Sequence, residues 1–161
     1  MYKRQALASN PLRLSEVLNL VLDTMHRALD FRSVVLCLRE PRSGHLVGRL
    51  GLGAGADDIS AAFRIVPEGA TQGDLFAALC VKGADMLIKD ATAVASHLPA
   101  WFRHRVNAGS FLVMPLQIKG SAIGLIYADK MAAGSITLHE PELVLLRALR
   151  DEAVAAFKRG A

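Results

Sequence analysis

The stretch that decides the fold is Ser110-Phe-Leu-Val-Met-Pro-Leu-Gln-Ile-Lys-Gly-Ser-Ala-Ile-Gly-Leu-Ile-Tyr-Ala-Asp129. It contains two strongly apolar segments, 110–119 and 122–131, separated by Gly120-Ser121, and this pattern predicts a β-hairpin. In the first segment, alternate positions are apolar on both faces of the expected strand. A strand of this kind belongs to a sheet that is covered on both sides.

The two ends of the chain supply the expected cover for one face of this sheet. Apolar residues recur at helical spacing near the amino end, at Leu14, Leu18, Val21, Met25 and Leu29. A second amphipathic helix is predicted from Thr137, with Glu140 in a capping box. Short helices and strands are expected between these ends, and the short helices would cover the other face. The pattern therefore predicts an α+β fold with a central antiparallel β-sheet and terminal helices on one face.

Length and composition indicate a single domain that spans residues 12–159. Residues 1–11 are expected to form a tail or the remnant of a linker. The chain has 161 residues, of which 52% are hydrophobic and 21% charged. Its apolar runs, such as Phe111–Leu116, are too short to cross a bilayer, so no membrane partner is expected. The net charge of +4 is scattered along the chain, which argues against a nucleic-acid partner.

Motifs for metal binding or catalysis are not evident in the sequence. The five histidines include no pair at i, i+4 spacing, so no metal site is expected. The sequence has no G-x-S-x-G elbow and no P-loop, and we expect neither catalytic residues nor a cofactor. Cys37 and Cys80 each lie in an apolar run without motif spacing, which favours a cytoplasmic protein with buried thiols.

Two stretches resemble the GAF domain, a small-molecule-sensing relative of the PAS fold. Residues 73–90 are similar to the family's helix, glycine turn and short strand ending in Asp, and residues 110–129 are similar to its late hairpin. More narrowly, Leu98-Pro-Ala-Trp-Phe102 and Leu125-Ile-Tyr-Ala-Asp129 resemble the GAF region that follows an HDOD domain in some bacterial signalling proteins. The likeness implies a PAS-like sheet with short helices over a pocket.

The resemblance also implies which residues would line that pocket, between the sheet and the middle helices. The positions that align with the family's pocket wall are Phe63, Phe76, Trp101, Phe111 and Met114, and the polar candidates for orienting a ligand are Arg64, Asp90 and Arg105. The alternative is a filled core, in which the same apolar side chains pack against each other.

The expected function is a non-enzymatic regulatory module of a bacterial signal-transduction protein, which senses an unknown small molecule, mediates dimerisation, or does both. Leu145 and Ala148 widen the apolar stripe of the last helix, which predicts a homodimer through the terminal helices. One alternative is a thiol-dependent enzyme similar to the free methionine sulfoxide reductases. However, Cys37 and Cys80 lack the closely spaced cysteine set of those enzymes. The other alternative is a ligand-free protein-interaction scaffold.

Overall fold

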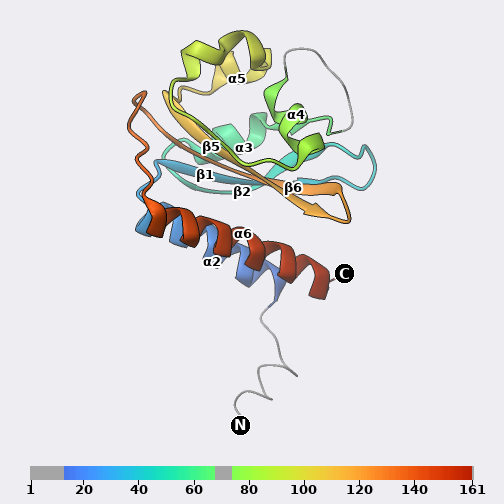
Figure 1. The fold of residues 1–161 in the computed structure, drawn as a ribbon. Helices are drawn as coiled ribbons and strands as arrows, with labels where there is room; N and C mark the ends of the chain where they lie inside the picture. Colours follow the sequence, from blue (N-terminus) through green and yellow to red (C-terminus); the bar gives the residue numbers. More distant parts are fainter. Residues whose placement is uncertain (1–12, 68–73, 161) are drawn as a thin grey trace.

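The computed structural model describes residues 13–67 and 74–160 and shows one antiparallel sheet between two layers of helices (Figure 1). The elements in chain order are α2 (Leu14–Ala28), β1 (Ser33–Arg39), β2 (Leu46–Gly53), α3 (Ala56–Ala62), β3 (Arg64–Ile65), α4 (Leu75–Lys82), β4 (Met86–Ile88), the 3-10 helix η1 (Ala91–His97), α5 (Ala100–Arg105), β5 (Ser110–Ile118), β6 (Ser121–Lys130) and α6 (Glu140–Gly160). The expected tail, residues 1–11, lies outside the described residues.

The sheet has six strands in the order β3-β2-β1-β6-β5-β4, and every neighbouring pair is antiparallel. The predicted hairpin is confirmed as β5 and β6, although its turn lies one residue earlier than expected. Ile118 pairs with Ser121, so the two-residue turn is Lys119-Gly120. Both turn residues have positive φ, 53° and 79°. These values are typical of the type I′ turns that match the twist of a hairpin.

Both faces of the central strands are buried, as the sequence pattern predicts. Along β6, Leu125 and Tyr127 belong to one core layer, whereas Ile126 and Ala128 belong to the other. Successive side chains of a strand point to opposite faces, so one strand contributes to both layers. The sheet therefore needs a cover on each side.

The terminal helices α2 and α6 lie side by side and cover one face, while α3, α4, η1 and α5 cover the other (Figure 1). Helix α2 buries Leu18, Val21 and Met25, as its spacing predicts. Helix α6 starts at Glu140, and its first turn is closed by the bond from the His139 amide to Glu142 Oε1, at 2.7 Å. The capping pair therefore lies two residues after the Thr137–Glu140 pair that the sequence suggested. No helix in the described part of the chain is long and apolar enough to cross a bilayer.

A buried ion pair joins the start of β1 to the end of β6. The Asp129 carboxylate is fully buried and accepts hydrogen bonds from Arg32 Nε at 3.1 Å and Arg32 Nη2 at 2.7 Å. The Tyr127 hydroxyl donates to the same carboxylate at 2.5 Å. Burial raises the pKa of Tyr127 well above its usual range, and the Asp129 charge raises it further. Tyr127 is therefore a neutral hydrogen-bond donor over the ordinary pH range.

Replacing Asp129 by Ala tests the contribution of this ion pair to stability. The substitution leaves Arg32 and the Tyr127 hydroxyl without their shared acceptor. Because the Arg32 side chain is 20% exposed, we expect a loss of about 2–4 kcal/mol in the free energy of unfolding, at or below the usual range for breaking a buried pair. Chemical denaturation measures the loss. The control Arg42→Ala, at an exposed site in the turn between β1 and β2, should change the value by less than about 0.5 kcal/mol. Equal effects of the two substitutions would show that the buried pair contributes nothing.

Candidate ligand-binding site

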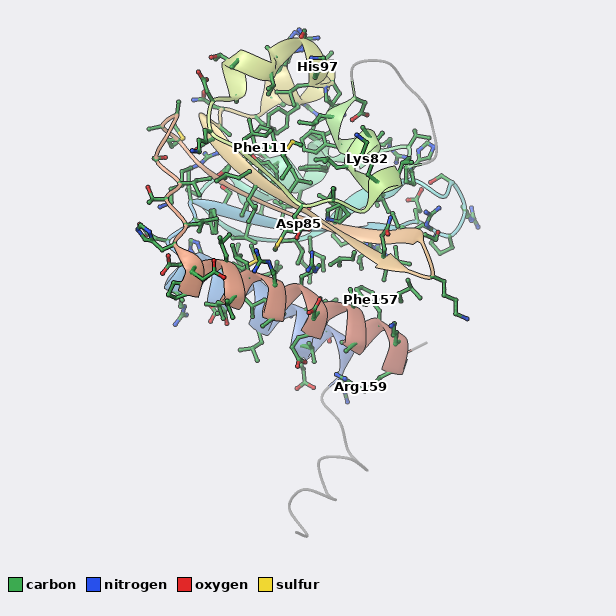
Figure 2. The ribbon with its side chains drawn as sticks, viewed as in Figure 1. Lys82, Asp85, His97, Phe111, Phe157 and Arg159 are labelled. Atoms are coloured by element: carbon green, nitrogen blue, oxygen red, sulfur yellow. The ribbon has the colours of Figure 1, made fainter. Side chains whose placement is uncertain are left out.

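Aromatic rings gather between the sheet and the short helices. The four aromatic residues expected to share a wall all lie in this layer: Phe63, Phe76, Trp101 and Phe111. The ring centroids of Phe63 lie 5.3 Å from Phe76 and 4.8 Å from Trp101, and Phe76 lies 5.8 Å from Phe111. Figure 2 shows Phe111 on the side of the sheet that carries the short helices, and Phe157 of α6 on the opposite side.

Two further rings complete this aromatic layer and were not anticipated from the sequence. The Phe102 centroid lies 5.1 Å from Phe111, and the Tyr127 centroid lies 5.3 Å from Phe63. Both side chains are buried. Separations of this size are ordinary contact between aromatic rings. Where these six rings lie, the space between sheet and helices is packed rather than open, which favours the filled-core alternative for that region.

Met114 does not belong to the aromatic layer, contrary to its placement in the expected wall. It packs in the opposite core layer, with residues of α2 and α6. The reason is the alternation of β5: Phe111 and Val113 point to the short helices, so Met114 must point away from them. The residues Phe111 and Met114 stand an odd number of positions apart and cannot line the same face of a regular strand.

The three polar candidates lie apart from the aromatic layer, each in an exposed position. Arg64 Nη1 lies 2.9 Å from His45 Nδ1 at the edge of the sheet. The Asp90 carboxylate accepts from the amide and hydroxyl of Thr92, at 3.1 and 2.7 Å, and so caps η1; these bonds lower its pKa. Arg105 is the exposed last residue of α5. The structure therefore does not bring these side chains together around one ligand.

A pocket of about 280 Å³ lies between η1 and α5, on the outer side of the aromatic layer. Its apolar lining consists of Ala91, Ala95, Leu98, Phe102, Val106 and Ala108, and its polar lining of Thr92, Arg103 and Asn107. Phe102 belongs to both the pocket and the aromatic layer. A mostly apolar hollow with a few polar groups is the usual form of a small-molecule site.

Arg103 is the charged group of this pocket. Its Nε donates to the Leu98 carbonyl oxygen at 3.2 Å, and this bond holds the guanidinium beside the pocket. Arg105, the residue expected from the sequence, lies two residues later on the same short helix and does not line this pocket. In a helix, a shift of two residues turns a side chain by roughly 200°, so Arg103 lines the pocket and Arg105 does not, although both residues are exposed.

The two cysteines are poorly placed for thiol chemistry. Cys37 and Cys80 are both buried in the core layer that also contains the aromatic rings. Burial raises the pKa of Cys37 well above its usual range, and the neighbouring Cys80 raises it further. A reactive cysteine needs the opposite setting, with a lowered pKa and access to solvent. Within residues 13–67 and 74–160, no cluster of three or more His, Cys, Asp or Glu side chains could hold a metal ion.

Comparisons with known proteins identify the family. The model of the GAF domain matches residues 13–157. The fold is similar to the GAF domain of an Acinetobacter phosphoenolpyruvate-protein phosphotransferase (TM-score 0.73, 13% identity, 98% of this chain and 90% of that chain). It is also similar to a GAF domain/HD domain protein from Geobacter sulfurreducens (TM-score 0.72, 12% identity, 92% and 94%). A third similar structure is the free methionine-R-sulfoxide reductase from Neisseria meningitidis in complex with its substrate (TM-score 0.65, 20% identity, 91% and 87%).

No curated protein matches the sequence. At these low identities the solved structures show a shared fold, and the family assignment rests on the match over residues 13–157. That match includes the central hairpin, both layers of helices and the pocket between η1 and α5. The chain belongs to the GAF domain family.

Proposed function

We propose that this chain is a non-enzymatic regulatory module of a bacterial signal-transduction protein, which binds a small molecule between η1 and α5 and pairs with a second copy through α2 and α6. The single observation that carries the sensing role is the pocket of about 280 Å³ lined by Arg103, Thr92 and Asn107. Its size and mixed lining suit a small ligand with an acidic or polar group. A cytoplasmic location and a neighbouring HDOD domain remain predictions.

The position of the pocket supports a role in regulation. The pocket shares Phe102 with the aromatic layer, and that layer includes Tyr127 of the central strand β6. Tyr127 is bonded to Asp129, which in turn holds Arg32 just after α2. A ligand that shifts Phe102 therefore acts on a continuous set of contacts that ends beside a terminal helix. Coupling between sites requires physical continuity of this kind, together with two arrangements of the elements involved.

The outer surface of the terminal helices supports self-association. Leu20 of α2 and Val144 of α6 are more than half exposed, at 58% and 54%. Ala148 lies one turn after Val144 on the same side of α6 and is also exposed, whereas Leu145 is half-buried. A two-fold dimer buries the same surface on both subunits, so the apolar area that one stripe contributes to the interface is doubled.

Thiol labelling tests the non-enzymatic part of the proposal. Because burial keeps Cys37 protonated, we expect both thiols of the folded protein to react with an aromatic disulfide reagent about 100-fold more slowly than in guanidinium chloride. The raised pKa keeps the rate of Cys37 low even at pH 9, the ordinary thiol value. Rapid labelling of either cysteine in the native state, at the rate of the unfolded chain, would favour the thiol-enzyme alternative.

A thermal-shift panel of nucleotides and amino acids tests small-molecule sensing. A ligand at a hundred times its Kd stabilises the native state by about 2.7 kcal/mol, which corresponds to a rise of roughly 5–10 °C in Tm for a chain of this size. Arg103→Gln should abolish most of the shift, because it removes the charged group of the pocket. The matched control Arg105→Gln, on the same helix and outside the pocket lining, should preserve it. No response across the panel would favour the scaffold alternative.

Light scattering after size-exclusion chromatography tests the dimer. The wild-type protein should elute at twice its chain mass of 17.3 kDa, and Ala148→Glu should shift it toward the monomer, because a charge is placed on the apolar stripe. The control is Val81→Glu on α4, where an apolar side chain is 63% exposed on the opposite layer. It should remain a dimer. Dissociation by Val81→Glu and not by Ala148→Glu would place the interface elsewhere.

A further inference from the structure

A second pocket lies on the other side of the sheet, between α6 and the strands β4 and β5. Its volume is about 180 Å³. Its lining is mainly apolar and consists of Asp85, Met86, Leu87, Leu112, Met114, Leu138, Leu143, Leu146 and Arg147. None of these residues lines the pocket between η1 and α5, so the two hollows are separate. Figure 2 shows Asp85 at the sheet, on the side that faces α6.

The floor of this second pocket is buried and its rim is exposed. Leu112, Met114 and Leu146 are 5%, 2% and 2% exposed, whereas Met86 is 38% exposed and Arg147 is also exposed. The open side of the pocket therefore lies near Met86 and Arg147. Methionine side chains are flexible and polarisable, so the two that line this pocket can adjust to a small apolar body.

The charged side chains at the rim favour an anionic ligand. Asp85 already forms an ion pair with Arg150 of α6, which also contacts Asp151, so the Asp85 carboxylate already has a cationic partner. Arg147 has a much weaker contact: its Nη1 lies 4.0 Å from Glu140 Oε2, beyond hydrogen-bond distance. The Arg147 guanidinium can therefore turn to an anionic group at the mouth of the pocket, where a two-pronged contact with a carboxylate is its preferred geometry.

We propose that this second pocket binds a small monocarboxylic acid with a compact apolar body, such as a single aromatic ring, with the carboxylate on Arg147. The size fits, since an apolar cavity of about 150 Å³ in another protein takes up benzene. Such a ligand contacts β4, β5 and α6 at once and therefore fixes α6 against the sheet. The inference is independent of the site between η1 and α5.

Titration with sodium benzoate, followed by NMR of protein labelled at the methionine methyl groups, tests this site. Met86 and Met114 line the pocket, while Met25 and Met131 lie away from it and serve as internal controls. We expect saturable shifts of the Met86 and Met114 signals and stationary signals for the two controls. Benzamide, which has the same ring without the charge, should bind at least about ten times more weakly, because it loses a charge-assisted hydrogen bond. Equal binding of benzoate and benzamide would overturn the acid specificity.

Paired variants of α6 separate this site from general charge effects. Arg147→Gln should weaken benzoate binding about ten-fold or more, whereas Arg159→Gln, the same change at an exposed site near the end of α6, should leave it unchanged. Leu143→Phe places a ring in the pocket and should abolish the Met114 shift. Benzoate shifts that survive Arg147→Gln, or that are absent from the folded wild-type protein, would overturn the proposal. Arg103→Gln should have no effect on these shifts, so failure here is distinct from failure of the sensing role.

Discussion

The structure depends on one constraint: the central strands of the sheet must be buried on both faces. β6 lies between β1 and β5, and its side chains alternate between two core layers. Neither layer of helices is sufficient alone, since the other face would then expose a row of large apolar side chains to water. The separation of the terminal helices from the short helices follows from this requirement.

The buried Asp129 carboxylate is the main exception to an otherwise apolar interior. A buried charge is costly unless it is paired and hydrogen-bonded, and here Arg32 and Tyr127 together satisfy it. Because Arg32 also donates its backbone amide to the Asp129 carbonyl at 2.8 Å, the pairing fixes the register at that end of the sheet. The same residues connect the aromatic layer to the segment that follows α2.

The parts of the fold that were predictable from the sequence are those set by local pattern. The alternation in residues 110–129 predicted the hairpin and its burial on both sides, and helical spacing predicted α2 and α6. The aromatic layer was found in part, because four of its rings are large apolar residues in the aligned segments. Met114 was misplaced because a family alignment was preferred to the strand alternation, which already assigned it to the other face.

The remaining details depend on contacts that local pattern does not encode. The Arg32–Asp129 pair joins residues 97 positions apart, and no local sequence pattern near either residue indicates its partner. Which arginine of α5 lines the pocket depends on the rotation of a helix of only six residues, too short for periodicity to fix its phase. The second pocket arises where α6 meets β4 and β5, and its lining comes from four separate stretches of the chain.

The two outermost strands of the sheet are unusually brief: β3 has two residues and β4 has three. Each of these border strands offers few backbone groups of its own to template the addition of a foreign strand, although β3 pairs with only Leu46 and Val47 of β2. Short border strands are one of the ways in which proteins limit strand exchange between neighbouring copies. Recognition between copies is then left to side chains, which evolution can alter without disturbing the sheet.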